Sequence, residues 1–300
     1  MSIIKVLGSS TLIGKYFIDT NVDYELICFS RKNKNHNYLD LQNEDTFLNF
    51  SCENSFIVSF APIWLVKNLI KKLEENNLNE LKTLKGVILF SSTSAVTKRF
   101  AANTFDKTLI KELISSEKEI LSIFKKYSIN CQIIRSTIIY GVYKDIDDRN
   151  FIKIINLFKK FPFCIIPSQT GYRQPIHFSQ LSELTYLLLE KLNKNNSKDT
   201  INQILEVGGD EEITYSELLK RLSIVASDHK NKRCKIITIP NKLFYVLIFP
   251  LLILKPKIFE ALFRMQSDLS GFPKYSDYTG KSSDKFPIKY FKTSQTQSYR

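Results

Sequence analysis

Two glycines and three hydroxyl residues near the N-terminus could together hold a phosphate group. They form the segment Gly8–Gly14, GSSTLIG, between an apolar run and a run with helical spacing. Glycines at a strand-to-helix turn let backbone N–H groups approach a pyrophosphate, and the helix dipole adds positive potential. The middle position, where a third glycine is typical, holds Thr11. We predict a dinucleotide site here, and the alternative is a tight turn with polar caps and no ligand.

The hydroxyls of Ser9, Ser10 and Thr11 can bond phosphate oxygens where the third glycine is missing. The turn residues expected at the dinucleotide are Gly8, Ser10, Thr11, Leu12, Ile13 and Gly14.

The second apolar run, Tyr24–Ser30, is followed by Arg31 and Lys32. An acidic side chain at this position would accept hydrogen bonds from the ribose of NAD, whereas an arginine can pair with the 2′-phosphate of NADP. The sequence therefore favours NADP over NAD, with Arg31 as the phosphate ligand.

Short apolar runs that alternate with amphipathic stretches must position these residues. The runs predict buried parallel strands over Ile3–Gly8, Tyr24–Ser30, Ser55–Ala61, Lys85–Ser92 and Asn130–Thr137. Helices are predicted over Trp64–Asn76 and Thr108–Lys126. This alternation indicates an α/β fold with a Rossmann-like, doubly wound parallel sheet and a smaller C-terminal lobe.

The alternation changes after Gly141, where loops rich in Asp, Pro and Tyr separate shorter helices. We predict a dinucleotide-binding domain over residues 1–140 and a mainly substrate-binding lobe over residues 141–300. The run Asn202–Asp210 predicts a late strand, near residues 202–208, that rejoins the sheet. Thr214 and Glu217 then have capping-box spacing at a helix start.

The formal net charge of +13 over 300 residues could attract nucleic acid or a membrane. The lysines are scattered and form no stripe with exposed aromatic residues, so we expect no nucleic-acid partner, and an anionic small ligand remains compatible. Five cysteines without close spacing predict neither disulfides nor a metal site. Together with an N-terminus unlike a signal peptide, they indicate a cytoplasmic protein.

The segment Leu243–Leu254, LFYVLIFPLLIL, is apolar throughout. It is shorter than the roughly 20 residues that span a bilayer, and Pro250 interrupts it. Lysines flank it at positions 242, 255 and 257. We expect a pair of helices packed in the core of the C-terminal lobe, and the alternative is peripheral contact with a membrane.

Several segments in chain order carry a family resemblance. They are GSSTLIG (8–14), YLDL (38–41), SFAP (59–62), FSSTSAV (90–96), IIRSTIIYG (133–141) and GYRQPIHFSQL (171–181). Together they resemble the short-chain dehydrogenase/reductase superfamily, particularly its extended and atypical branches with nucleotide-sugar epimerases and dehydratases. The resemblance implies NAD or NADP as cofactor, and a nucleotide sugar or another anionic metabolite as substrate.

The resemblance also implies roles for individual residues. It places Asp40, Leu41, Ser59 and Ala61 at the cofactor and Arg173 and Gln174 at the substrate. The catalytic candidates are Thr93, Ser92, Tyr140 and His177. For His177 the alternative is a buried structural imidazole, and for Arg173 and Arg135 it is a structural ion pair.

The Tyr-x-x-x-Lys pair that performs proton transfer in this family has no counterpart here. When the family's Lys-x-x-x-Glu spacing is matched to Glu117, Leu113 stands at the Lys and Leu109 at the Tyr, and no tyrosine occurs between Val96 and Lys126. Two hypotheses follow. The first is an NAD(P)-dependent enzyme related to epimerases and dehydratases, and the second is a non-catalytic dinucleotide-binding protein with a regulatory or scaffold role. A nucleic-acid binder is a third, based on charge alone.

Overall fold

The computed structural model describes residues 2–21, 23–99, 103–194, 202–227 and 233–288. The chain forms two compact units, each built from several segments. Unit 1 consists of Met1–Arg99, Thr108–Ser136 and Phe178–Val207. Unit 2 consists of Phe100–Lys107, Thr137–His177 and Gly208–Arg300.

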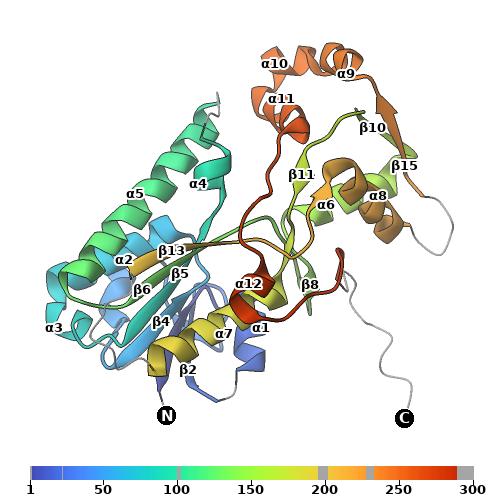
Figure 1. The fold of residues 1–300 in the computed structure, drawn as a ribbon. Helices are drawn as coiled ribbons and strands as arrows, with labels where there is room; N and C mark the ends of the chain where they lie inside the picture. The colour runs from blue at the N-terminus through green and yellow to red at the C-terminus, as the bar shows by residue number, and fades with distance from the viewer. Residues whose placement is uncertain (1, 22, 100–102, 195–201, 228–232, 289–300) are drawn as a thin grey trace, which may run out of the picture. The chain divides into compact units, whose positions relative to one another are not determined.

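Within the described residues, unit 1 contains a seven-stranded parallel sheet in the order β13-β6-β5-β4-β1-β2-β3 (Figure 1). Its strands are β1 (Ile3–Leu7), β2 (Glu25–Ser30), β3 (Asn37–Tyr38), β4 (Ser55–Ser59), β5 (Gly86–Ser92), β6 (Cys131–Ser136) and β13 (Asn202–Val207). The predicted doubly wound parallel sheet is confirmed. The late strand is β13, which pairs with β6.

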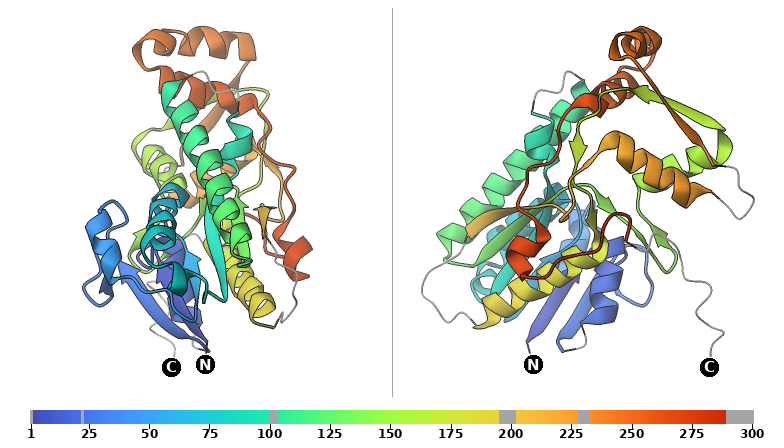
Figure 2. Two further views of the ribbon diagram at one scale, coloured as in Figure 1. Left: turned by 90° about the vertical axis from the view of Figure 1, so that its left-hand side faces the viewer. Right: turned by 45° about the vertical axis from the view of Figure 1, so that its right-hand side comes forward.

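Helices cover both faces of this sheet (Figures 1 and 2). The helices associated with unit 1 are α1 (Leu12–Thr20), η1 (Glu44–Asn49), α2 (Ile63–Asn76), α3 (Leu78–Leu81), α4 (Ser94–Thr97), α5 (Thr104–Lys126, whose first four residues belong to unit 2) and α7 (Phe178–Lys194). Helices α1 and α7 pack together on one face, and α2 and α5 lie on the other. Because both faces are covered, all residues of β4 are buried, which explains its apolar run Phe56–Val58.

The direction of winding reverses between β1 and β4. From β1 the chain passes through α1 to β2 on one side, whereas β4 pairs with the other edge of β1. In open α/β sheets a ligand binds at such a switch point, beyond the carboxyl ends of the strands. The residues that follow β1 and β4 are Gly8 and Phe60. The topology therefore indicates that a ligand site, if present, lies beside these two residues.

Unit 2 is built from short strand pairs and helices. The pairs are β7 (Ile139–Tyr140) with β12 (Ile176–His177), β8 (Val142–Tyr143) with β9 (Ile146–Asp147), β10 (Phe163–Pro167) with β15 (Lys235–Ile239), and β11 (Tyr172–Arg173) with β14 (Ile213–Thr214). The helices are α6 (Phe151–Lys160), α8 (Tyr215–Ala226), α9 (Asn241–Ile248), α10 (Pro250–Leu254), α11 (Pro256–Phe263), η2 (Arg264–Gln266) and α12 (Tyr275–Thr279). Helices α6 and α8 pack against each other, and the Thr214 hydroxyl caps α8 by accepting from the Glu217 N–H at 3.2 Å.

The expected core placement of Leu243–Leu254 is wrong, although the segment is helical as predicted. Phe244 and Ile248, four residues apart on α9, are buried. By contrast, Val246 is 73% exposed and Ile253 is 79% exposed. Helix α9 buries only these two side chains, and α10 contains no buried residue, so most of the segment is partly or largely exposed. None of the helices in the described part of the chain is long and apolar enough to cross a membrane.

Candidate functional site

Gly8 turns the chain sharply at the end of β1. Its φ is +70°, which L side chains rarely adopt. A β-carbon on Gly8 would lie 2.7 Å from the backbone N of Ala61 and 2.9 Å from the carbonyl carbon of Phe60. No side chain fits there, and the structure brings two predicted site positions, Gly8 and Ala61, together at the switch point.

Gly14 is the third residue of α1 and lies against the same turn. A β-carbon on Gly14 would lie 2.5 Å from the carbonyl oxygen of Gly8. The start of α1 therefore packs directly on the turn, and the strand, turn and helix predicted from GSSTLIG are confirmed. β1 ends at Leu7, one residue before the predicted end.

Thr11 is the N-cap of α1, and its hydroxyl serves the turn itself. Its Oγ1 accepts from the Gly14 N–H at 3.1 Å and donates to the Gly8 carbonyl at 2.8 Å. The first N–H groups of an α-helix have no acceptor within the helix, and Thr11 takes up the one at Gly14. The backbone N–H groups of Leu12 and Ile13 thus remain as the donors that α1 can offer to an anion.

The two serines of the turn differ in accessibility. Ser9 is buried and donates to the Phe29 carbonyl at 2.7 Å, so its hydroxyl ties the turn to β2. Ser10 is exposed, and its Oγ lies 3.3 Å from the Oγ of Ser30. Ser10 is therefore the turn hydroxyl that a ligand could reach.

His36 also contacts the turn, and it is not among the residues predicted from the sequence to lie there. Its Nε2 lies 3.2 Å from the Asn33 amide nitrogen and its Nδ1 lies 2.8 Å from the Ser9 Oγ. Since the Asn33 nitrogen donates, Nδ1 carries the ring proton and donates to Ser9. Partial burial lowers the pKa of His36, which favours this neutral form. No local motif marks His36, because it meets Ser9 from 27 residues away.

Arg31, the predicted phosphate ligand, is exposed beyond the end of β2. Its Nη1 donates to the Gln42 Oε1 at 2.7 Å and lies 3.6 Å from the Asp40 Oδ1. The structure thus places the Arg31 guanidinium close to the Asp40 carboxylate. Lys32 and Lys34 are exposed in the same loop and add positive charge.

The remaining predicted cofactor residues line the turn after β4 and the loop after β3. The Ser59 Oγ is buried and accepts from the Ala61 N–H at 3.3 Å, which fixes the backbone beside Gly8. Leu41 is partly buried and packs against the core of unit 1. These residues shape the surroundings of the turn.

The hydroxyls predicted to be catalytic are engaged at the end of β5. Thr93 is buried, and both its Oγ1 and its N–H donate to the Ser136 carbonyl, at 3.2 and 3.1 Å. The Ser92 Oγ accepts from the Ser94 N–H at 3.1 Å. These bonds join β5 to β6 and supply an acceptor for the first N–H group of α4.

Glu117 on α5, the residue to which the family's Lys-x-x-x-Glu spacing was matched, forms an ion pair with Arg135. Glu117 is 1% exposed and receives hydrogen bonds from the Arg135 Nε at 2.9 Å and Nη2 at 2.5 Å. The Ser91 hydroxyl donates to the same carboxylate at 2.5 Å. Arg135 therefore has the structural role given as its alternative. One turn earlier, Leu113 is 2% exposed in the apolar core of unit 1, and Leu109 packs against that core.

Tyr140 and His177 pair with each other in unit 2. Their rings are 5.1 Å apart in an edge-on arrangement, and the Tyr140 ring also packs against Phe286. Burial raises the pKa of Tyr140 and lowers the pKa of His177 to about 4. Both groups are therefore neutral at pH 7 and poorly suited to general acid–base catalysis there.

Arg173 and Gln174 are buried in unit 2 and bond its backbone. The Arg173 guanidinium donates to the carbonyls of Tyr172, Ser267 and Arg264, at 2.8, 2.6 and 2.6 Å. The Gln174 amide donates to the Gly209 and Phe272 carbonyls and accepts from the Phe272 N–H. These bonds favour a structural role for both residues over the predicted contact with substrate.

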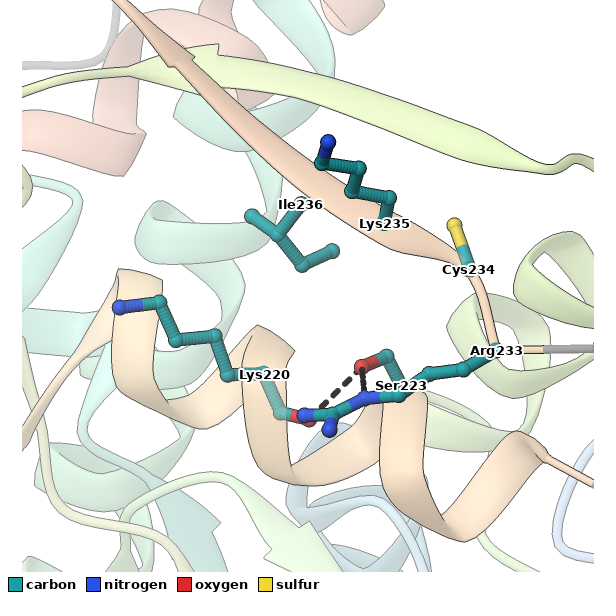
Figure 3. A pocket seen from close by; sticks show the side chains of 6 residues that line it. All are labelled: Lys220, Ser223, Arg233, Cys234, Lys235 and Ile236. Atoms are coloured by element: carbon teal, nitrogen blue, oxygen red, sulfur yellow. Dashed lines mark hydrogen bonds between the residues drawn. The ribbon is translucent and has the colours of Figure 1, made fainter. Parts of the chain in front are cut away.

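A cavity of about 410 Å³ in unit 2 contains none of the predicted site residues (Figure 3). It lies between α8 and β15 and is lined by Lys220, Ser223, Arg233, Cys234, Lys235 and Ile236. The Arg233 guanidinium is held by the Ser223 hydroxyl and the Lys220 carbonyl. Among the described residues, no cluster of three His, Cys, Asp or Glu side chains could hold a metal ion.

No protein-family model and no curated protein sequence matches the chain. Solved structures do match it. UDP-N-acetylglucosamine 4-epimerase from Bacillus cereus has a TM-score of 0.57 and 14% identity, over 82% of this chain and 90% of that one. GDP-mannoheptose C4 reductase from Campylobacter jejuni, with NADP bound, has a TM-score of 0.60 and 12% identity, over 80% and 87%.

A third similar structure is dTDP-glucose 4,6-dehydratase from Bacillus anthracis in complex with NAD. Its TM-score is 0.54 at 15% identity, over 82% of this chain and 90% of that one. At such identities the likeness concerns the fold. The chain has the Rossmann-like α/β fold of these nucleotide-sugar epimerase, reductase and dehydratase structures.

Proposed function

We propose that unit 1 binds a nicotinamide dinucleotide, NADP in preference to NAD, across the Gly8–Gly14 turn and the end of β2. The observation that carries this proposal is the pair of glycines. A β-carbon at Gly8 or Gly14 would collide with backbone atoms at 2.7 and 2.5 Å. Because neither residue has a β-carbon, backbone atoms and the N-terminus of α1 are accessible at the switch point of the sheet. Such a site suits a pyrophosphate.

We assign different parts of the dinucleotide to different residues of the chain. The N–H groups of Leu12 and Ile13 and the Ser10 hydroxyl would bond the pyrophosphate, while Arg31 would pair with the 2′-phosphate. When bound, such a dinucleotide supplies hydride transfer at its nicotinamide ring. We propose a nucleotide sugar or another anionic metabolite as the second ligand, which the names of the structural relatives support.

A test should separate binding from folding. We expect calorimetric titration of the full chain to show binding of NADP and weaker binding of NAD. Ser10→Asp places a carboxylate at the N-terminus of α1, where it favours the helix but repels a pyrophosphate. This variant should lose at least tenfold in affinity with an unchanged or higher melting temperature.

Ser216→Asp, in the first turn of α8 in unit 2, is the matched control and should leave dinucleotide affinity unchanged. Failure of the parent chain to bind either dinucleotide would refute the proposal. An unchanged affinity in Ser10→Asp would remove the turn from the site. Native mass spectrometry of gently purified protein tests the second ligand, which should be retained as a nucleotide sugar or another anionic metabolite.

A second candidate function is dinucleotide binding without turnover. The buried apolar environment of Leu113 favours it, because an ammonium at that position is needed to lower the pKa of the catalytic phenol. The hydroxyl of Thr93 and the rings of Tyr140 and His177 are already engaged inside their own units. Loss of general acid–base catalysis costs about 10²–10⁴-fold in rate.

We therefore expect measurable NADPH affinity with little oxidation of NADPH by simple ketones and little change of common UDP-sugars. Absorbance at the nicotinamide band and chromatography of the sugars measure these outcomes. Rapid turnover by the unmodified chain would contradict the second candidate and support the enzyme.

A further inference from the structure

Helices α9, α10 and α11 of unit 2 present a contiguous series of exposed apolar side chains. On α9 and α10 these include Leu243, Val246, Leu247, Phe249, Ile253 and Leu254, each more than half exposed. Ile258 and Phe263 continue the exposed surface on α11. Soluble proteins rarely leave such a surface uncovered, and a concentration of this kind marks an interaction site.

The helices hold these side chains on one connected element. α10 follows α9 after Phe249, and α11 turns back and packs against both (Figures 1 and 2). The Tyr245 and Phe263 rings lie 5.4 Å apart and link α9 to α11. We call the exposed apolar surface of Asn241–Phe263 the apolar helical face.

The charged residues around the apolar helical face differ in exposure according to their sign. The exposed charged residues of the fully described segment Asn241–Phe263 are Lys242, Lys255 and Lys257. Its single acid, Glu260, is turned toward Arg264, at 3.5 Å, and toward the Asn103 amide, at 2.6 Å. The exposed charge that accompanies the apolar side chains is thus entirely positive.

Asp106, near this face, is likewise an acidic residue that is buried and paired with an arginine. It lies on the first turn of α5, and its partner is Arg264, at 2.8 Å. Next to it, Phe105 is exposed, and the Lys257 Nζ lies 3.5 Å from its ring centroid. The carboxylate is held inside while an aromatic ring and an ammonium remain at the surface.

We propose that the apolar helical face docks unit 2 on an anionic lipid surface, with the helices lying in the plane of the interface. Apolar side chains flanked by lysines match the composition of interfacial helices, which sink their apolar face to the acyl boundary while lysines contact anionic headgroups. The short, Pro250-interrupted helices suit this placement, because none of the described helices can span a bilayer.

Charge complementarity favours lipid over a second copy of the chain. In a symmetric dimer through this face, the lysines of one copy would meet the same lysine-bearing surface of the other. Like charges brought together at an interface oppose association, whereas an anionic membrane attracts them. The net charge of +13 acts in the same direction.

Co-sedimentation of the full chain with lipid vesicles tests the proposal. We expect binding to phosphatidylcholine vesicles that contain phosphatidylglycerol, weaker binding to phosphatidylcholine alone, and release by salt. Ile253→Glu and Val246→Glu should each weaken binding on the order of tenfold. Each of Lys242→Gln, Lys255→Gln and Lys257→Gln should weaken it about fivefold. These side chains are exposed, so the melting temperature should stay unchanged.

Leu48→Glu is the matched control, because Leu48 is an exposed leucine of unit 1, outside the apolar helical face. It should leave vesicle binding unchanged. Light scattering of the vesicle-free chain supplies the second measurement. A dimer that Ile253→Glu converts to monomer, without vesicle binding by the parent chain, would overturn the proposal in favour of a second copy. A monomer that binds neither type of vesicle would also overturn it.

Discussion

Units 1 and 2 both contain segments that resemble the same family, but their polar side chains have different uses. In unit 1, Ser10 and Arg31 are exposed beside a turn whose two glycines leave bare backbone. In unit 2, Arg173 and Gln174 are buried, and their hydrogen bonds go to the backbone of the unit itself. The segments that carry the resemblance therefore leave polar side chains at the surface in unit 1 and use them as internal hydrogen-bond donors in unit 2.

The difference follows from how each unit satisfies its backbone. In unit 1 most strand carbonyls are paired within the sheet, so side chains at the strand ends can serve other purposes. Unit 2 has only two-stranded pairs, which helices and loops connect, and buried carbonyls outside a strand ladder or helix need other donors. Arginine with five N–H donors and glutamine with two can supply them. A polar residue type within a motif thus acquires its role from the backbone around it.

The largest expected difference between the units is the effect of Arg173→Met on the stability of unit 2. It removes the donor for three carbonyls, and we expect unit 2 to lose about 3 kcal/mol in free energy of unfolding. The affinity of unit 1 for NADP should not change. Urea unfolding and calorimetric titration measure the two quantities.

Arg149→Met, at an exposed arginine of unit 2, is the control and should change stability by less than about 0.5 kcal/mol. If Arg173→Met left the stability intact, the guanidinium would be available to a ligand, and the contrast between the units would fail.

The pH dependence of the free energy of unfolding should show that the His177 imidazole is buried and neutral in folded unit 2, as expected for a structural residue and not for a catalytic base. Burial lowers the pKa of folded His177 to about 4, so between pH 7 and 5 the unfolded chain binds a proton that the folded chain does not. The free energy of unfolding therefore falls as the pH falls, by about 2 kcal/mol over this window. Unfolding in urea at both pH values measures this change.

His177→Gln should remove this part of the pH dependence. Burial also lowers the pKa of His36, so His36→Gln should remove only the contribution of His36 and leave that of His177 in place. If His177→Gln had the same pH dependence as the parent chain, the imidazole would titrate normally. The interpretation of His177 as a base for catalysis would then regain support.

The parts of the fold that could be predicted are those with a periodic or conformational signal. The buried strand β4 has an apolar run, Phe56–Val58, between two serines, and α2 repeats buried residues at helical spacing. Gly8 and Gly14 mark positions where no side chain fits. These signals are local, so the sequence carries them without knowledge of distant contacts.

The features that the sequence does not reveal involve contacts that span many residues or depend on burial. The Thr93 hydroxyl is engaged by Ser136, which lies 43 residues away, and His36 reaches the turn from the loop after β2. The apolar run Leu243–Leu254 suits a core and a membrane-facing surface equally well, because both require the same residue types. Only the exposed fraction of each side chain separates the two.

The smallest effect we predict concerns the choice between NADP and NAD in unit 1. Arg31 is exposed and close to Asp40, and solvent screening limits such contacts to about 1 kcal/mol, or fivefold in affinity. Arg31→Ala should therefore weaken NADP binding about fivefold and leave NAD binding nearly unchanged. Asp40→Asn should have the opposite effect on the ratio of NADP to NAD affinity, because it removes a carboxylate that competes with the 2′-phosphate for Arg31. Titrations of both dinucleotides with each variant, at low and moderate salt, measure this ratio. Equal affinities for NADP and NAD in the parent chain would remove Arg31 from the site, but the glycine turn would remain as the test of dinucleotide binding itself.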